Sequence, residues 1–170
     1  KLVSDASGAY YAGKTGDVVI IVDVIDMSTT LECAIEAGSI AVYGAAPDHV
    51  KPPVPVDPEK IGYKVGKESV CKNASIILVS EPRWGTENDM KKNAQKVVRG
   101  IERAGGIIER FIPNLGLTTV KLHDFNNKLT IGVTDTGGTA FDTALNSGGL
   151  VLTGTIARTT KYKGVFPALI

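Results

Sequence analysis

The sequence predicts a single-domain α/β protein, with a mostly parallel β-sheet and helices on both faces in a Rossmann-like three-layer sandwich. Three observations lead to this prediction. Short apolar runs rich in β-branched residues alternate with amphipathic stretches, which is typical of strands and helices packed in layers. Glycines and hydroxyl residues stand between these segments, where turns are needed. The length of 170 residues suits one hydrophobic core, so residues 1–170 are assigned to one domain.

The apolar runs predict six strands. The first run is an almost continuous β-branched segment, which indicates a strand buried on both faces of a parallel sheet. The later runs are bounded by glycines and polar residues, as strands between turns are. The six expected strands comprise residues 17–25, 40–45, 74–80, 107–112, 128–134 and 150–156.

Three helices are expected to begin at a threonine that precedes an acidic residue by three positions, which is the spacing of a capping box. The stretch after Thr86 has the clearest helical stripe of apolar residues, and it ends at two glycines. The three pairs are Thr29 with Glu32, Thr86 with Asp89, and Thr139 with Asp142, and the helices are expected to end at Gly38, Gly105 and Gly148.

Three segments are expected to lie outside this alternation. Residues 47–58 contain five of the eight prolines, which predicts a loop, either a surface connection or a lid over the sheet edge. Residues 114–127 are ambiguous, because 118–125 suits a short helix or a strand equally well. Residues 158–170 are expected to be an exit segment that leads to a further region.

Composition excludes several classes of function. The formal net charge is +1, and like charges form no block, so neither nucleic acid nor an anionic membrane surface is an expected partner. The longest apolar runs have six or seven residues, far below the roughly 20 that a spanning helix needs. Residues 1–16 do not have the pattern of a signal peptide. Cys33 and Cys71 suit unpaired thiols in a reducing cytosol, so a cytoplasmic location is expected.

The first strand-to-helix turn is a candidate ligand site. Asp23 and Asp26 end the strand, and the hydroxyl residues Ser28, Thr29 and Thr30 begin the helix. Free amides at a helix N-terminus, together with hydroxyl donors, suit a phosphate group, and carboxylates suit Mg²⁺. The alternative is that a hydroxyl only caps the helix and Asp26 complements its dipole. Asp23 is harder to explain in this way, since a carboxylate in an apolar strand is costly unless it is paired.

The second candidate turn follows the fifth expected strand. Thr136, Gly137, Gly138 and Thr139 combine close backbone approach with hydroxyl donors, and Asp135 adds a carboxylate. The alternative is a tight turn without a ligand. Ligands of parallel α/β sheets bind beyond the carboxyl ends of the strands. Both turns are therefore expected at the same edge, where they would open into a common pocket.

Two arginines are further candidates for anion contacts. Arg83 lies in the loop 81–85 after the third strand, where a guanidinium can bind a phosphate or carboxylate in bidentate fashion, and the neighbouring Trp84 would wall the site. The alternative for this loop is a surface ion pair and a packing aromatic. Arg158 follows the sixth strand and has the same two interpretations. The two histidines, His49 and His123, are expected to face solvent.

Three segments resemble the 2-phosphosulfolactate phosphatase family. The segment from Val22 to Ile25, followed by Met27 to Leu31, is similar to the family's strand that ends in Asp before an Arg and a hydroxyl-rich helix start. The segment from Thr134 to Ala140 is similar to its Asn-Gly-Thr motif, with Gly137 in place of the Asn. Glu81, Arg83 and Gly85 resemble an acidic–Arg–Gly loop of that family. The main departure is that the family's first Arg is Asp26 here.

The resemblance covers about half of the chain and implies a Mg²⁺-assisted phosphatase-like hydrolase. The family hydrolyses the phosphoester of a small sulfonated hydroxy acid in coenzyme M biosynthesis. In the hydrolase hypothesis, Asp23 and Asp26 are expected to hold Mg²⁺, with Asp135 as a further candidate ligand, and Asp23, Asp26 and Arg83 are the expected catalytic residues. The phosphate contacts would come from Ser28, Thr29, Thr30, Thr136, Gly137, Gly138, Thr139 and Arg158.

Two other classes of function remain open from the sequence. The same turns would serve a phosphate- or anion-binding sensor domain without catalysis, or they would be helix caps in a structural subunit. In the first two hypotheses the partner is a small anionic molecule, and the sequence leaves open whether the protein forms a homo-oligomer.

Overall fold

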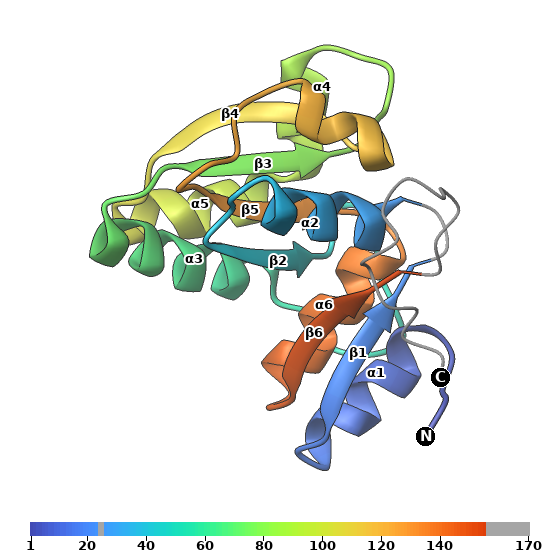
Figure 1. Ribbon diagram of the computed structural model, residues 1–170. Helices are drawn as coiled ribbons and strands as arrows, with labels where there is room; N and C mark the ends of the chain where they lie inside the picture. Colours follow the sequence, from blue (N-terminus) through green and yellow to red (C-terminus); the bar gives the residue numbers. More distant parts are fainter. Residues whose placement is uncertain (24–25, 156–170) are drawn as a thin grey trace.

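The computed structural model describes residues 1–23 and 26–155, and it confirms the single-domain α/β fold. All paired strands are parallel, and they form two sheets rather than one (Figure 1). The smaller sheet pairs β1 (Val18–Val22) with β6 (Leu150–Gly154). The larger sheet has the order β2 (Ala41–Ala45), β5 (Leu129–Val133), β3 (Ile76–Ser80) and β4 (Ile108–Pro113).

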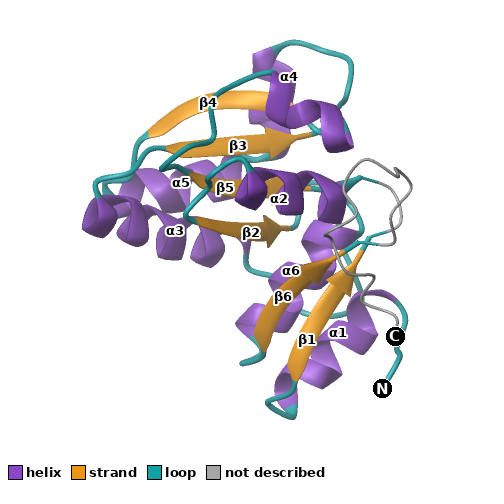
Figure 2. Cartoon of the chain, in the orientation of Figure 1, coloured by secondary structure: helices purple, strands orange, loops and turns teal. Residues whose placement is uncertain are grey.

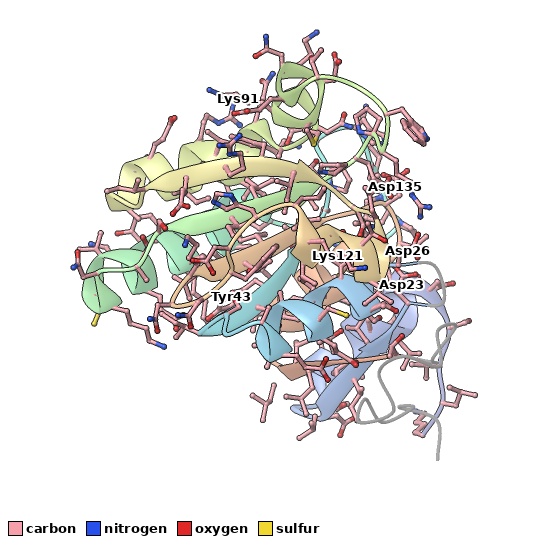
Figure 3. The ribbon with its side chains drawn as sticks, turned by 45° about the horizontal axis from the view of Figure 1, so that its top comes forward. Asp23, Asp26, Tyr43, Lys91, Lys121 and Asp135 are labelled. Atoms are coloured by element: carbon pink, nitrogen blue, oxygen red, sulfur yellow. The ribbon has the colours of Figure 1, made fainter. Side chains whose placement is uncertain are left out.

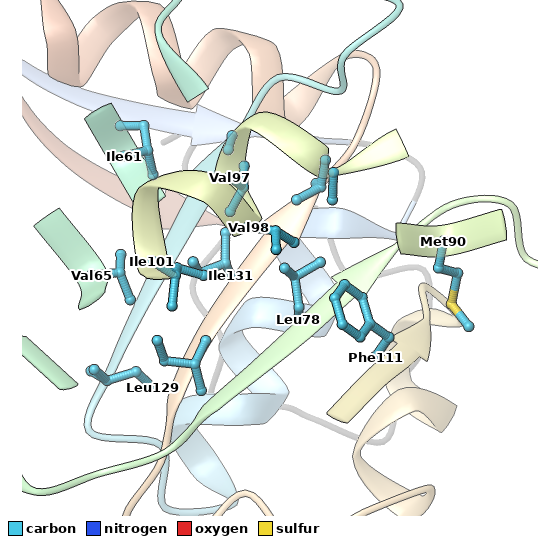
Figure 4. Packing of buried hydrophobic residues seen from close by; sticks show 14 residues of the cluster. Ile61, Val65, Leu78, Met90, Val97, Val98, Ile101, Phe111, Leu129 and Ile131 are labelled. Atoms are coloured by element: carbon cyan, nitrogen blue, oxygen red, sulfur yellow. The ribbon is translucent and has the colours of Figure 1, made fainter. Parts of the chain in front are cut away.

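Helices cover both faces of the larger sheet, as the sequence predicts (Figure 2). On one face lie α3 (Pro58–Lys72) and α5 (Gln95–Ala104), whose buried side chains form the main core with β2, β3, β4 and β5 (Figure 4). On the other face lie α2 (Met27–Glu36) and the 3₁₀ helix η1 (Gly116–Lys121). Buried apolar surface thus holds the sheet from both sides.

Among the described residues, helices cover one face of the smaller sheet. There, α1 (Asp5–Lys14) and α6 (Gly137–Asn146) contact each other and bury Val19 and Ile21 of β1. α1 has no counterpart among the elements expected from the sequence. α6 also packs against β2, so it connects the two sheets.

The helix α3 was not predicted either, although it forms the largest helix–helix contact of the fold with α5. Its start follows ordinary rules, because Asp57 caps it by accepting a hydrogen bond from Lys60 N at 3.0 Å and Pro58 occupies the first turn. Its glycines allow the close contact. A Cβ on Gly62 would lie 2.1 Å from the Val97 carbonyl oxygen, and a Cβ on Gly100 would lie 2.0 Å from the Glu59 carbonyl oxygen.

Of the three expected capping boxes, only the one at Thr86 is present. Thr86 Oγ1 accepts from Asp89 N, and the Asp89 side chain accepts from Thr86 N, at the start of α4 (Glu87–Asn93). The single helix expected after Thr86 is two helices, because α4 and α5 are separated at Ala94. The other two predicted starts are wrong, since α2 begins at Met27 and α6 begins at Gly137, each without a side-chain cap.

The segments of uncertain type are resolved as follows. Residues 47–57 contain neither helix nor strand, and Pro58 begins α3. Within 114–127 the structure has the 3₁₀ helix η1. The exit segment 158–170 lies outside the described residues.

Candidate functional site

Acidic residues gather at the carboxyl edge of the strands. Asp23 follows β1, Glu81 follows β3 and Asp135 lies two residues after β5, while Asp26 is the N-cap residue of α2. Figure 3 shows Asp23, Asp26 and Asp135 on the same side of the molecule. Since parallel strands end at one edge, the topology explains why residues so distant in sequence lie together.

The two predicted turns are in contact. Thr136 Oγ1 donates a hydrogen bond to Asp23 Oδ2 at 3.4 Å. Gly137 fits closely against the same carboxylate, because a Cβ at this position would lie 2.5 Å from Asp23 Oδ2 and 2.5 Å from Met27 Cε. The first residues of α6 therefore contact the end of β1, which precedes α2 in the chain. This is expected for two turns at the same edge. Asp23 is only 8% exposed, so this contact is almost buried.

The hydroxyl groups of the first turn are used inside the protein. Ser28 Oγ accepts from Asp23 N at 2.6 Å, which ties the start of α2 to the end of β1. Thr30 Oγ1 donates to Asn114 Oδ1 at 2.7 Å, and Thr29 Oγ1 shares a hydrogen bond of 2.8 Å with Thr155 Oγ1. These three hydroxyls hold α2 in place. Because these hydroxyls bond within the protein, the groups that could bind an anion at the start of α2 are the first backbone N–H groups of the helix.

The second turn is also shaped by packing. A Cβ on Gly138 would lie 2.2 Å from the Ala45 carbonyl oxygen, so this glycine is needed for α6 to approach β2. Gly138 N donates to Thr134 Oγ1 at 2.8 Å. Thr139 is buried, and its Oγ1 has no hydrogen-bond partner among the described residues. Asp142 accepts from Ala46 N and Asp57 N, at 3.1 and 2.7 Å. Thr139 and Asp142 therefore do not form the predicted cap.

The only arginine placed at this edge among the described residues is Arg83, which forms an ion pair with Asp26. Asp26 has φ of 82°, and a Cβ on Gly116 of η1 would lie 2.9 Å from its Oδ1. The loop after β3, the first turn of α2 and the start of η1 thus meet at this carboxylate. Trp84, beside Arg83, is 90% exposed, so it neither packs on the core nor forms a wall in this conformation.

Glu81 and His49 join the cluster. Glu81 was expected only as part of the acidic–Arg–Gly loop, without a role of its own, and His49 was not a predicted site residue. Burial raises the pKa of Glu81, and the nearby carboxylates of Asp135 and Asp23 also raise it, whereas Arg83 and His49 lower it. His49 Nε2 lies 3.3 Å from Asp135 Oδ1, so the proline-rich loop reaches the site. The prediction that His49 only faces solvent is incomplete, because its half-exposed ring has an acidic partner. A polar residue at a strand end was the signal for Glu81, but no sequence signal marks His49.

The carboxylates do not form a metal site by themselves. Within residues 1–23 and 26–155, no group of three or more His, Cys, Asp or Glu side chains is arranged to hold a metal ion. One of the three predicted metal ligands, Asp26, is paired with Arg83, and another, Asp135, lies beside His49. The residues present therefore do not fit a resident Mg²⁺ held by Asp23, Asp26 and Asp135 alone. The remaining predicted anion contact, Arg158, lies outside the described residues.

In the part of the chain that the structure describes, no helix has the length and apolar character needed to cross a membrane. Comparisons of the chain with protein-family models, with curated proteins and with solved structures find no match.

Proposed function

We propose that the carboxyl edge binds the phosphate group of a small phosphorylated acid, together with Mg²⁺ that arrives with this ligand, and that the protein is a phosphatase-like hydrolase. The observation that supports the proposal best is the meeting of two helix starts at one carboxylate. α2 and α6 both begin beside Asp23, and Arg83 lies at the same edge through its ion pair with Asp26.

The donors at this edge suit phosphate oxygens. The first N–H groups of a helix have no partner within the helix, and the helix dipole favours negative charge there. Two ten-residue helices begin at this place, and neither N-cap side chain accepts a hydrogen bond from its helix, although Gly138 N of α6 donates to Thr134 Oγ1. Arg83 adds a guanidinium, and its side chain is 38% exposed, against 24% for its partner Asp26. Ion pairs that reach solvent contribute about 1 kcal/mol or less, so the guanidinium can leave Asp26 at small cost.

The acidic side chains argue that the phosphate does not bind alone. Asp23, Asp26, Glu81 and Asp135 are opposed by Arg83 and, when it is protonated, by His49. Two like charges about 4 Å apart near a protein surface repel by roughly 4 kcal/mol, so a bare phosphate would be disfavoured. Mg²⁺ is commonly held by one or two carboxylates together with substrate phosphate oxygens. A Mg²⁺–phosphate complex therefore matches this edge, although the protein has no cage of three carboxylates.

In hydrolysis the residues of the chain would have separate tasks. The N–H groups at the starts of α2 and α6 orient the phosphoryl oxygens, and Arg83 neutralises the charge that develops on them. Asp23 and Asp135 would face the cation of the ligand. A Mg²⁺ ion brought by the ligand would supply charge neutralisation at the phosphoryl oxygens. The similarity of the two turns to 2-phosphosulfolactate phosphatases supports this assignment, and Asp26 in place of the family's Arg leaves the substrate's acid group undefined.

The test measures the melting temperature with inorganic phosphate, with MgCl₂, and with both. Only the pair is expected to stabilise the protein. A ligand at 100 times its Kd adds about 2.7 kcal/mol, which raises the Tm of a domain of this size by roughly 5–10 °C. Arg83→Gln is expected to lose this shift, whereas Arg110→Gln, at an exposed position on β4, retains it. No shift with the pair would refute the site.

A second measurement separates catalysis from binding. p-Nitrophenyl phosphate is expected to be hydrolysed in the presence of Mg²⁺, and Asp23→Asn is expected to lose this activity. If Mg²⁺ and phosphate stabilise the protein together but p-nitrophenyl phosphate and other small phosphoesters are not hydrolysed, the chain is a binding domain and the hydrolase assignment is wrong.

A further inference from the structure

Asp26 occupies the N-cap position of α2, yet its side chain does not cap the helix. The Asp26 backbone carbonyl accepts a helical hydrogen bond from Thr30 N at 2.8 Å. The side chain of an N-cap aspartate usually accepts a second bond, from an N–H group of the first turn. The Asp26 side chain makes no such bond and is instead paired with Arg83. The guanidinium is therefore occupied by a carboxylate that belongs to the chain itself.

The backbone at Asp26 has an unfavourable conformation. Its φ is 82° and its ψ is −40°, which lies outside the left-handed helical region that aspartate tolerates best. The start of η1 limits the movement of the carboxylate, because a Cβ on Gly116 would lie 2.9 Å from Asp26 Oδ1. Strained residues persist only where their surroundings fix them, and they are frequent at ligand clamps and switch regions. The strain therefore indicates that the position of this carboxylate serves the edge rather than the helix.

We propose that Asp26 is an internal competitor of the ligand's phosphate group, which must displace the Asp26 carboxylate to reach Arg83. This inference rests on the proposed function, since it concerns the specificity of the same edge. A carboxylate and a phosphate present oxygens to a guanidinium in the same bidentate manner, so one can replace the other. Arg83 is the arginine of this edge in the described part of the chain, so its occupation leaves a free anion without a guanidinium partner.

Two contributions of Asp26 act against a free phosphate. The ion pair with Arg83 must be broken, and pairs that reach solvent change an equilibrium constant by about fivefold at most. The displaced carboxylate then stays close to the phosphate, and like charges at about 4 Å near a protein surface weaken binding by more than tenfold. Removal of the Asp26 charge removes both contributions. Asp26 is therefore the residue that decides whether the edge accepts a free phosphate.

Isothermal titration calorimetry with inorganic phosphate, in the absence of Mg²⁺, tests the proposal. Asp26→Asn retains the shape of the side chain and removes its charge, and it is expected to bind phosphate about tenfold or more tightly than the wild type. Asp26→Gly is expected to give the same gain. Because glycine adopts a positive φ without strain, this second variant keeps the test valid if Asp26→Asn folds poorly.

Two controls separate the competition for Arg83 from a general effect of charge. Asp135→Asn removes a negative charge from the same edge, but Asp135 is paired with His49 and not with Arg83, so a smaller gain is expected. The double variant Asp26→Asn/Arg83→Gln is expected to lose the gain of Asp26→Asn. Phosphate affinity that is unchanged in both Asp26 variants, that rises equally in Asp135→Asn, or that stays raised in the double variant would overturn the proposal.

The same samples distinguish a failure of this inference from a failure of the proposed function. If phosphate and MgCl₂ together raise the melting temperature of the wild type but the Asp26 variants gain no phosphate affinity, the competition by Asp26 is wrong and the proposed function stands. If the wild type shows no shift with the pair, the proposed function fails. In that case a gain in the Asp26 variants still supports the competition, and the absence of a gain overturns it.

Discussion

Gly137→Ala tests the geometry on which the candidate site depends. In the structure, the position of a Cβ at residue 137 is 2.5 Å from Asp23 Oδ2, 2.5 Å from Met27 Cε and 3.0 Å from Asp23 Cβ. Distances of this size are far below the roughly 3.5–4.0 Å of a normal carbon contact. The added methyl would therefore push the start of α6 away from the end of β1 and the start of α2.

Two effects of opposite sign determine how much Gly137→Ala changes the free energy of unfolding. Overpacking in a buried site typically costs about 1–3 kcal/mol. Part of this cost is absorbed, because Met27 Cε is the end of a flexible side chain. Gly137 is also the first residue of α6, where alanine gains up to about 1 kcal/mol of helix propensity over glycine. The expected net loss in the free energy of unfolding is about 1–2 kcal/mol.

Urea denaturation measures this loss, and Gly132→Ala is the matched control. Gly132 also faces Met27, but its Cβ would lie 3.2 Å from Met27 Cγ, so a loss below about 1 kcal/mol is expected. Gly137→Ala is expected to weaken the joint stabilisation by Mg²⁺ and phosphate, whereas Gly132→Ala is expected to retain it. If Gly137→Ala unfolds within about 0.5 kcal/mol of the wild type and binds as before, the two turns do not meet as described.

Three further predictions concern packing and charge. Asp142→Asn places an NH₂ group against one of the backbone donors of Ala46 and Asp57, so a loss of roughly 2–3 kcal/mol is expected in urea denaturation, and a neutral result would contradict the description of this buried carboxylate. Gly100→Ala would force α5 away from α3 and is expected to cost about 3 kcal/mol or more by the same assay, while Glu102→Ala, on the exposed face of α5, should stay within about 0.5 kcal/mol of the wild type. Glu81→Gln is expected to gain stability relative to the wild type as the pH rises from 4 to 8. The pKa of Glu81 is raised by folding, so its contribution is fully present below the unfolded pKa of 4.5 and is lost as the pH rises through the folded pKa; thermal unfolding at both pH values measures this, and an equal difference at both would exclude the shift.

The strands were predictable because their sequences contain little ambiguity. β3 and β5 are buried at every position, and their β-branched and apolar runs between polar turns suit only a covered parallel strand. The division into two sheets was not predictable. It depends on which strands pair, and β1 pairs with β6 from the far end of the chain. An apolar run in the sequence predicts a strand, but it does not specify which other strand will pair with it.

The helix α3 was missed for a physical reason. Gly62 and Gly66 lower helix propensity by up to about 1 kcal/mol each, and they follow a proline-rich loop, so local propensity argues against a helix. The glycines are favourable only because α5 packs directly on them, with the α3 backbone at Gly66 also close to Ile101 and Ala104. Tertiary contact of this kind outweighs propensity and cannot be inferred from one segment.

The capping pairs show how a short pattern is overridden. Thr86 and Asp89 are exposed and have no competing partner at longer range, so they form the capping box. Thr29 instead shares a hydrogen bond with Thr155, and Asp142 holds the two ends of the proline-rich loop. The spacing of a threonine and an acidic residue is therefore informative mainly where both side chains remain on the surface.

The candidate site was predictable as a place but not as a full set of residues. Ligands of parallel α/β sheets bind beyond the carboxyl ends of the strands, and this rule predicts that Asp23 and Thr136 lie close together. The hydrogen bond between them agrees with the prediction. His49 reaches the site from a loop whose path has no sequence rule, and only the fold places it beside Asp135. Long connections carry functional residues that periodicity does not reveal.

The ion pair of Asp26 and Arg83 shows how the edge has a positive charge although the first turn has no arginine. At the position of the first turn where the similar family has an arginine, this chain has Asp26, and Arg83 reaches that turn from the loop after β3. The guanidinium is thus supplied from a different element, and a carboxylate is added beside it. A site with one arginine and no extra carboxylate would favour a bare anion, whereas this edge has four carboxylates around its donors. Under the proposed function, the edge would therefore favour a phosphate that carries its own cation over a free phosphate, and the joint addition of Mg²⁺ and phosphate measures this distinction.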